Sequence, residues 1–458
     1  MTFSDTESNG IPELGIDVVE PGRRARNGRA KLELNRDITF STAGLESYAF
    51  ARWEPLIYDA MVVAATVECG DRMLKRPQQG WPRKLSLRIP VHDPDRWQAD
   101  SVVKPLRDAL EFLTGDNWSI CFSRRFSKAQ SPSQEYLKLS TDTKAVIAYS
   151  DGMDSRAVAC ILGQSLGDGL VRVRVGPTKW DCSVHSSKRI PFATVPYETS
   201  STVCKRESTA RARGFKFALI SGIAAYLTHA NEVVIPESGQ GTIGPALVSV
   251  GHGYPDYRNH PLFTVRMQRF IQALLGRQIK FLHPRIWHTK AETLRAAVSI
   301  SNDRNIGDTR SCWRDNRWSS INGVRRQCGV CAACMLRRVA VHEAHLSEPA
   351  DTYIACAMNA ASLDKAVVSK FTKLTKAFRE YAIAGFLHMD HLAEMADDWS
   401  LPSTNTHGTL LAPALGLSVE DACRRLRAML SRHANEWKKY LESLGPNSFL
   451  MKWARGQS

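Results

Sequence analysis

The stretch KAVIAYSDGMDSRAVACILG, from Lys144 to Gly163, runs from a short apolar segment through small polar residues into a helical pattern. Its apolar part, 145–148, predicts a buried strand, and the residues from Met153 onward predict a helix. A strand that opens into a helix in this way places unpaired backbone amides at the positive end of the helix dipole, where phosphate binds. The stretch therefore predicts a βα turn that either binds a nucleotide phosphate or is only capped by its own Ser and Asp side chains.

The polar residues of this turn are candidate nucleotide ligands. Gly152 allows the backbone to approach an anion closely, while Ser150 and Ser155 offer hydroxyl groups. Asp154 is a candidate ligand for Mg²⁺ or a helix cap. Asp151 would repel a polyphosphate unless it binds the metal or points away. The cofactor-binding set predicted here is Ser150, Asp151, Gly152, Asp154 and Ser155.

Strand-like and helix-like segments continue to alternate after the turn. Residues 170–175 and 232–237 are strand-like, and 210–230 carry a long helical pattern between them. This alternation predicts an α/β fold with a doubly wound parallel sheet, in which ligands bind beyond the carboxyl ends of the strands. Ser150 and Glu237 fall at two of these ends.

Shifts in composition divide the chain into five parts. The first thirty residues are polar and rich in Gly, Pro and Arg, which is typical of a flexible tail. Strand patterns at 84–91 and 118–123, with a helical pattern at 101–115, predict a small α/β domain. The predicted parts are the tail 1–30, the small α/β domain 31–123, a polar linker 124–139, a doubly wound domain 140–345 and a helical region 346–458.

The 458 residues carry a formal net charge of +15 and eleven cysteines. The charge favours anionic partners, and because Lys and Arg are spread along the chain it does not single out nucleic acid. No apolar run reaches the roughly 18 residues of a membrane span, and residues 1–28 contain no signal-peptide core. We therefore expect a cytoplasmic protein without membrane contact, whose cysteines are thiols or metal ligands rather than disulfides.

Four cysteines are closely spaced, in the pattern C-x₁₅-C-x₂-C-x₂-C. Four thiolates with two short spacings suit a tetrahedral Zn²⁺ site, and the alternative is a chance cluster of buried thiols. Because protein ligands fill all four positions, such a zinc ion would be structural. The predicted metal ligands are Cys312, Cys328, Cys331 and Cys334.

Three segments together resemble a known family. The turn is similar to the SGGxDS loop of the PP-loop ATP pyrophosphatases, with Asp151 in place of the first glycine of that loop. The S-C-W…C-G-x-C-x-x-C-x-L-R element from Ser311 to Arg337 resembles the cysteine element of the QueC family, ATP-dependent 7-cyano-7-deazaguanine synthases. GYPDYR, at 253–258, is similar to that family's G-Y-P-D-C-R segment. The resemblance extends over roughly 144–338 and implies an adenine nucleotide alpha-hydrolase-like fold.

The chain also departs from the usual QueC pattern. It adds about 140 residues before the turn and about 115 after the cysteines. Ala332-Ala333 replace the usual Asp-Ser, Tyr257 replaces the cysteine of the Tyr-Pro-Asp segment, and IPESGQGTIGP, at 235–245, replaces a Gly-Val-Asn stretch. These features resemble the enlarged QueC-like proteins of bacterial anti-phage operons, in the Qat system and in type IV CBASS.

The resemblance implies an ATP- and Mg²⁺-dependent enzyme that adenylates the carboxylate of 7-carboxy-7-deazaguanine and then forms an amide. For the defence relatives it implies an attacking amine on a partner protein, which would give a nucleobase–protein conjugate. It implies that Asp154 and Ser155 are catalytic. The substrate-binding residues that it implies are Glu237, Gln240, Asp256 and Arg258.

Several alternatives remain open on the sequence alone. Glu237 and Gln240 either read the guanine-like edge, bind metal, or only form a polar βα loop, and Asp256 and Arg258 either bind substrate or form a structural ion pair. At the level of the whole protein, the alternatives are a biosynthetic synthase that uses ammonia and a relative that binds nucleotide or nucleic acid without turnover. Steep salt-dependent binding to nucleic acid would favour the last of these.

Overall fold

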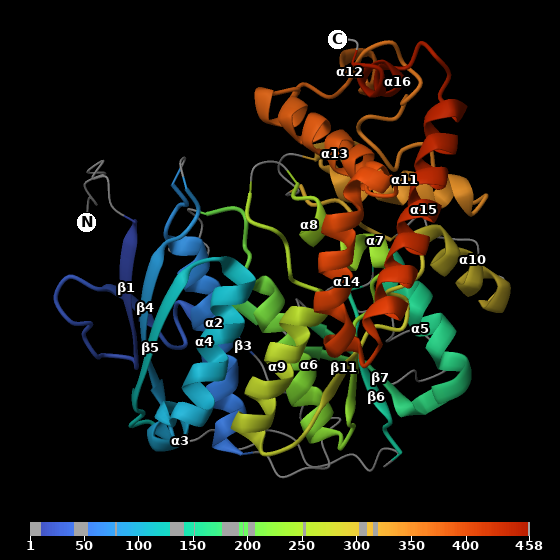
Figure 1. Cartoon of the computed structure of the whole chain (residues 1–458). Helices are drawn as coiled ribbons and strands as arrows, with labels where there is room; N and C mark the ends of the chain where they lie inside the picture. The colour runs from blue at the N-terminus through green and yellow to red at the C-terminus, as the bar shows by residue number, and fades with distance from the viewer. Residues whose placement is uncertain are drawn as a thin grey trace. The chain divides into compact units, whose positions relative to one another are not determined.

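The chain is organised in two units, whose elements are drawn in Figure 1. The first unit combines Met1–Thr141, Val173–Asn231 and Phe263–Lys280, and the second combines Asp142–Arg172, Glu232–Leu262 and Phe281–Ser458. The computed structural model describes residues 11–40, 54–77, 80–128, 142–150, 152–175, 192–195, 197–199, 207–250, 253–301, 309–314 and 319–456.

The first unit is built on a parallel sheet of four strands in the order β2-β1-β4-β5. β1 (Glu13–Val19) pairs in parallel with β2 (Ala30–Glu33) and with β4 (Lys84–Val91), and β4 pairs in parallel with β5 (Asn117–Arg124). Alternate residues of β4 from Leu85 onward are buried, as a two-residue period requires. The strands and the helix predicted for the small α/β domain are thus confirmed.

Helices pack on this sheet and on one another. α2 packs against β4, and α6 packs against α2 and α4. α2 is buried along nearly its whole length, and its buried carboxylates Glu68 and Asp71 form ion pairs with Lys216 and Arg83. α4 ends at Gly115, whose φ of +68° gives the left-handed cap that favours glycine. The helices of this unit are α2 (Pro55–Met73), α3 (Pro94–Gln98), α4 (Asp100–Thr114), α6 (Arg213–Leu227) and α9 (Pro261–Leu275), and a small antiparallel pair joins β3 (Ile38–Phe40) to β9 (Tyr197–Thr199).

The flexible tail predicted at 1–30 is wrong for β1, which lies inside that range. Ile16 and Val18 of this strand are 0% and 5% exposed, because β2 and β4 flank the strand on both sides. The Arg-rich loop that follows is held by Asp17, which accepts hydrogen bonds from Arg26 N at 3.0 Å and Arg29 Nε at 2.5 Å. The polar composition therefore reflects an anchored loop beside a strand.

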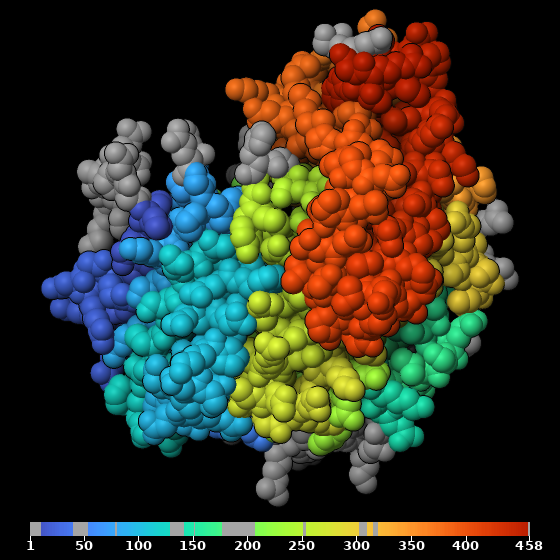
Figure 2. Space-filling model, in the orientation of Figure 1, coloured from blue at the N-terminus to red at the C-terminus, as the bar shows by residue number. Residues whose placement is uncertain are grey.

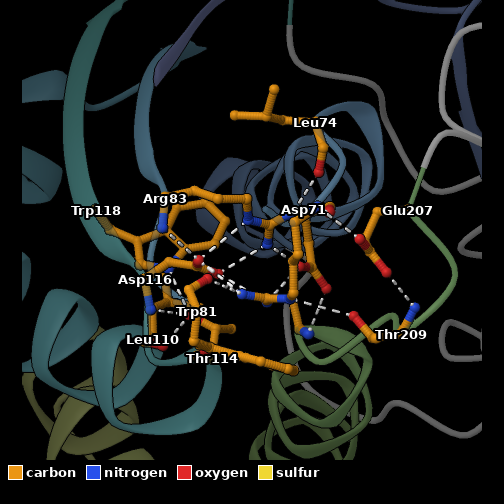
Figure 3. Close-up of polar contacts among 12 residues, drawn as sticks. Asp71, Leu74, Trp81, Arg83, Leu110, Thr114, Asp116, Trp118, Glu207 and Thr209 are labelled. Atoms are coloured by element: carbon orange, nitrogen blue, oxygen red, sulfur yellow. Dashed lines mark hydrogen bonds and ion pairs between the residues drawn. The ribbon is translucent and has the colours of Figure 1, made fainter. Parts of the chain in front are cut away.

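A buried network of charged side chains lies at the amino ends of β4 and β5 in this first sheet (Figure 3). Arg83, just before β4, is fully buried and donates from Nη2 to Asp71 Oδ1 at 2.6 Å and to Asp116 Oδ2 at 2.8 Å. Arg76 donates from Nη1 and Nη2 to the two oxygens of Asp116, at 2.8 and 2.9 Å, and its guanidinium lies over the Trp81 ring. Paired in this way, the charges join the end of α2 to the starts of β4 and β5.

A second sheet has five strands in the order β11-β10-β6-β7-β8. β6 (Ala145–Ala148) pairs in parallel with β10 (Glu232–Val234). From β6 the chain proceeds to β7 (Leu170–Val175) and β8 (Phe192–Val195) on one side, and later to β10 and β11 (Lys280–Leu282) on the other. The direction of winding therefore reverses between β6 and β10. This confirms the predicted doubly wound α/β fold, whose ligand site is expected at that switch point.

Helices dominate the remainder of the second unit, as the sequence predicts for its C-terminal part. α5 packs on α10, and α13, α14 and α15 pack together around a large apolar cluster. In Figure 2 the orange and red atoms of these C-terminal helices form one continuous surface. The helices are α5 (Met153–Leu166), α7 (Gly239–Thr242), α8 (Gly244–Leu247), α10 (Lys290–Ser301), α11 (Ala332–Glu343), α12 (Leu363–Ala366), α13 (Lys376–Glu394), α14 (Leu401–Leu415), α15 (Val419–Ser443) and α16 (Phe449–Ala454), with 3₁₀ turns η1 (Gly167–Gly169) and η5 (Asp398–Ser400).

Two further observations concern predicted features of the whole chain. Most of the predicted linker, 129–139, lies outside the described residues, so the linker stays a prediction. Within the described residues, no helix is both long enough and apolar enough to cross a membrane.

Candidate active site

The predicted phosphate-binding turn joins β6 to α5 at the carboxyl edge of the second sheet. Gly152 caps α5, and its N–H lies 3.4 Å from Ser150 Oγ. Ser155 Oγ donates to the Gly152 carbonyl at 3.0 Å and lies 3.3 Å from Ser150 Oγ. The turn thus brings the two predicted serines together beside the first N–H groups of α5. Asp151 lies outside the described residues, and its predicted role stays untested.

Gly152 is closely packed within this turn. A Cβ at this position would lie 3.1 Å from Ser150 Oγ and 3.2 Å from the Arg310 carbonyl oxygen. A side chain here would therefore push on the Ser150 hydroxyl and on the backbone that leads to Cys312. The absence of a side chain leaves backbone amides accessible at the start of α5, as an anion cradle needs.

Three charged side chains meet beside the turn. Asp154, in the first turn of α5, forms a hydrogen-bonded ion pair with Lys290 Nζ at the start of α10. Lys290 Nζ also lies 3.6 Å from Glu237 Oε1, just beyond β10. The predicted residues Asp154 and Glu237 are thus brought together at the switch point by a lysine that the sequence analysis does not single out.

Burial makes this triad electrostatically unusual. Burial and then repulsion from Asp154 raise the pKa of Glu237 to about 8. Burial alone would lower the pKa of Lys290, but the two carboxylates outweigh it and raise that pKa. Within the described residues, Asp154 Oδ1 and Glu237 Oε1 are buried and have no hydrogen-bond partner. These two buried carboxylate oxygens lie beside the N–H groups at the start of α5. This arrangement suits a magnesium ion that carries a nucleotide polyphosphate.

A local signal for Lys290 does exist in the sequence. In Thr289-Lys290-Ala291-Glu292, the Thr289 N–H donates to Glu292 Oε2 at 2.8 Å and the Glu292 N–H donates to Thr289 Oγ1 at 3.2 Å. This reciprocal capping box fixes the start of α10 and puts a lysine at its first position. A cation there opposes the helix dipole, so a lysine at this position indicates a nearby negative partner rather than helix stability.

Gln240 differs from the predicted substrate-binding role. Its side chain is 1% exposed, and Oε1 accepts a hydrogen bond from Lys290 N at 2.7 Å. Its Nε2 lies 2.8 Å from His433 Nδ1 and 3.4 Å from Glu436 Oε2. Protein groups therefore occupy the whole amide, and Gln240 supports the lysine instead of facing a ligand.

Asp256 and Arg258 form the ion pair that the sequence leaves as an alternative. Arg258 Nε lies 3.0 and 2.9 Å from the two Asp256 oxygens, and Arg258 Nη2 lies 2.5 Å from Oδ2. The Asp256 N–H also donates to the Pro245 carbonyl at 3.0 Å, which ties the pair to α8. Both side chains remain partly exposed, and their contact with a substrate stays a prediction.

The four predicted zinc ligands cluster in space. Their sulfur atoms all lie within 4.8 Å of one another, and Cys328 Sγ is 3.8 Å from Cys334 Sγ. A zinc–sulfur bond of about 2.3 Å gives a tetrahedron with edges of about 3.8 Å, so this spacing fits Zn²⁺. The N–H groups of Cys328 and Cys331 donate to the sulfurs of Cys312 and Cys328, both at 3.3 Å.

Local backbone structure explains how the cysteines converge. A hairpin of β12 (Ser320–Ile321) and β13 (Val324–Arg325) lies in the long spacer between the first two cysteines. Gly329 has a φ of +85°, and a Cβ there would lie 2.6 Å from the Ala355 carbonyl oxygen, so the knuckle requires glycine. Cys331 then caps α11. The cluster therefore fixes the chain next to Arg310, whose carbonyl lies against the turn at Gly152.

Part of this site lies in a segment that matches a known protein family. Residues 237–345 match the family model described as QueC, queuosine biosynthesis protein QueC. No curated protein matches the chain. The matched segment contains Glu237, Lys290 and all four cysteines. It therefore extends from the switch point of the sheet to the four-cysteine cluster. The match supports a QueC-like, ATP-dependent enzyme.

Proposed function

We propose that this protein is an ATP-dependent, AMP-forming enzyme that activates the carboxylate of 7-carboxy-7-deazaguanine. The observation that carries the proposal is the meeting of Asp154, Glu237 and Lys290 beside the phosphate-binding turn. Two carboxylates hold the magnesium ion of a bound polyphosphate, and a lysine with the helix N–H groups balances its negative charge. The QueC match over 237–345 supports deazaguanine-related chemistry at this site.

In the proposed first step, a substrate carboxylate oxygen attacks the α-phosphorus of ATP. The bond from that phosphorus to the bridging oxygen breaks, and pyrophosphate leaves. The N–H groups at the start of α5, with Ser150 and Ser155, bind phosphate oxygens, while Lys290 stabilises the charge that develops on pyrophosphate. Asp154 and Glu237 hold Mg²⁺, which supplies further charge stabilisation. The product is an acyl-adenylate, in which AMP is now a good leaving group.

In the proposed second step, an amine attacks the acyl carbon, the carbon–oxygen bond to AMP breaks, and the nitrogen loses a proton to solvent. We propose an amine of a partner protein as the acceptor, in an anti-phage system. The size of the chain supports this, because the four-stranded first sheet and the helices from α12 to α16 lie outside the QueC match and add surface for a partner protein. With ammonia as the acceptor, the same site would first form the primary amide, and a second ATP-dependent activation with loss of water would convert that amide to the free nitrile base.

The role of the triad is tested with Asp154→Asn and a matched control, Asp168→Asn. Asp168 is an exposed residue of η1, a few residues beyond α5. Loss of the Asp154 charge is expected to lower AMP formation by about 10²–10³-fold, a typical effect of removing one electrostatic contact in an active site. The control should retain wild-type activity. Equal rates for the two variants would exclude Asp154 from the chemistry.

The acceptor is identified by mass spectrometry after turnover with a candidate partner protein and with ammonia in parallel reactions. A partner protein that gains the mass of the deazaguanine acyl group supports conjugation. A free amide or nitrile base in the ammonia reaction, with no adduct on any protein, would instead assign the chain to the biosynthetic synthases.

A further inference from the structure

Four buried polar side chains lie directly behind Lys290, and we name them the α15 contact cluster. Two come from the matched segment around the site, and two come from α15, which lies outside that segment. All are at most 6% exposed, so each needs a partner inside the protein. The cluster consists of Gln240, Thr289, His433 and Glu436.

The first set of contacts runs from Lys290 through Gln240 to α15, and its direction is fixed. The Lys290 backbone N–H can only donate, so the Gln240 atom that faces it at 2.7 Å is the oxygen Oε1. Gln240 Nε2 must therefore donate to His433 Nδ1, at 2.8 Å. His433 Nε2, 3.1 Å from the Met389 carbonyl, then carries the imidazole proton and donates it.

His433 is accordingly neutral. Burial lowers its pKa to about 4, and a proton on Nδ1 would face the Gln240 N–H group. The neutral ring with hydrogen on Nε2 is the form that satisfies both neighbours. His433 thus acts as a fixed acceptor that sets the orientation of the Gln240 amide.

The second set of contacts runs through Thr289. Its hydroxyl donates to Glu436 Oε1 at 2.6 Å, and Glu436 Oε2 lies 3.4 Å from Gln240 Nε2. The Thr289 oxygen also accepts the Glu292 N–H of the capping box. Glu436 therefore contacts both residues that hold the Lys290 backbone. These are Thr289, which precedes Lys290, and Gln240, which accepts the Lys290 N–H.

We propose that His433 and Glu436 of α15 are positioning residues, which hold Lys290 between Asp154 and Glu237 through Gln240 and Thr289. Neither residue contacts the reacting groups, and both act through the turn that begins α10. The C-terminal helical region is then a required part of the active site, in addition to any role that it has in binding a partner. This inference rests on the proposed function for its activity readout, but its structural readout is independent of that function.

The first experiment compares Glu436→Gln with Glu442→Gln, the same change at an exposed position of α15. Glu436 accepts from the Thr289 hydroxyl and faces the Gln240 NH₂ group. In Glu436→Gln the side-chain oxygen can accept from one of these donors, while the new NH₂ group faces the other, so one of the two contacts is lost. We expect kcat/KM for ATP to fall by about 10–100-fold, which is typical when a residue that orients an active-site group is changed. Amide hydrogen exchange at 289–292 should increase while the urea midpoint stays near that of the control.

A second pair of variants covers the case in which Glu436→Gln folds poorly. His433→Asn retains an oxygen near the position of Nδ1, whereas His433→Leu has a similar shape without an acceptor. We expect Asn to keep most of the activity and Leu to lose it. Equal activity and equal exchange at 289–292 for Asn and Leu would overturn the proposal, as would a loss that only follows global stability.

The two proposals fail in distinguishable ways. If the wild-type chain forms no AMP, the proposed function falls, and the exchange difference between Glu436→Gln and Glu442→Gln still tests the positioning role. If the wild-type chain forms AMP while all four variants match it in rate and in exchange, the positioning role falls and the function stands.

Discussion

Lys290 shows how a single residue can be decisive for a site and still be missed in a sequence. It lies 136 residues from Asp154 along the chain, and no local pattern connects the two. Their pairing depends on the packing of α10 against α5, which the sequence suggests only as an alternation of strands and helices. The local feature that points to Lys290 is the capping box at the start of α10, which puts this lysine at the first position of the helix.

Replacing Lys290 by Met tests its role at the residue scale. The change leaves Asp154 and Glu237 buried without their cation, so phosphate would meet acidic groups with no positive charge beside them. We expect AMP formation to fall by at least about a hundredfold. Lys365→Met, at an exposed lysine of α12, is the matched control. Wild-type rates in Lys290→Met would contradict the assignment.

The proposed role of Glu237 as a Mg²⁺ ligand predicts that magnesium binding depends on pH. Its pKa is raised to about 8 by burial and by Asp154, so in the metal-free protein it is mostly protonated at pH 7. Since only the carboxylate binds Mg²⁺, binding must release the proton. The affinity for Mg²⁺ should therefore rise about tenfold per pH unit below pH 8 and level off above it.

Calorimetric titration with Mg²⁺ between pH 6 and 9 measures this dependence directly. Two buffers of different ionisation enthalpy report the released proton. Glu237→Gln should bind more weakly and without the slope below pH 8. An affinity that is constant across this range in the wild-type protein would argue against Glu237 as a ligand.

At the scale of elements, the four-cysteine knuckle follows a segment that packs against the turn between β6 and α5. The Ser311 N–H donates to Gln327 Oε1 at 2.9 Å, next to Cys312 and Cys328, and the Arg310 carbonyl lies against the turn at Gly152. A zinc ion on the cysteines would thus fix one wall of the phosphate-binding turn. We therefore expect the loss of a zinc ion from these cysteines to affect the proposed active site as well as the local fold.

Metal analysis and activity of Cys331→Ser test this connection. We expect one zinc per wild-type chain, loss of that zinc in the variant, a lower melting temperature and little AMP formation. Cys121→Ser, at an exposed cysteine of β5, should keep its zinc and its activity. A Cys331→Ser variant that retains stoichiometric zinc would contradict the four-cysteine site.

Elements also show which parts of the fold were predictable. The strand at 84–91 and the strand–helix pair around 145–163 occur as predicted, and the predicted helical region 346–458 contains the long helix α15. β1 was missed because its strand character depends on β2 and β4 pairing with it, beside an Arg-rich loop that reads as a tail. The role of Gln240 depends on α15, which no pattern in 235–245 reveals.

The charge network of the first unit shows the same dependence on long-range contacts. Asp116 pairs with Arg83 and Arg76 in a buried site, so Asp116→Asn would leave two guanidinium groups without one of their carboxylates. We expect a loss of about 3–5 kcal/mol in the free energy of unfolding. Urea unfolding measures it, with the exposed Asp100→Asn as a control that changes little. A loss no greater than that of the control would refute the structural role.

At the scale of the whole molecule, the QueC-like segment is a minor part of the chain. It supplies Glu237, Lys290 and the cysteines, while Asp154 precedes it and the residues that position Lys290 follow it. Parts of the chain on both sides of the match therefore contribute to one site. The partner protein and the defence setting stay proposals, because they depend on molecules other than this chain.

The most direct test is whether the protein activates the carboxylated base with ATP. The wild-type protein is incubated with ATP and Mg²⁺, with and without 7-carboxy-7-deazaguanine, and pyrophosphate, acyl-adenylate and free AMP are quantified. We expect pyrophosphate to form only when the carboxylated base is present, in an amount equal to the acyl-adenylate plus the AMP that an amine or water has released from it. ATP binding without pyrophosphate release, or pyrophosphate release that does not depend on the base, would contradict the proposed activity.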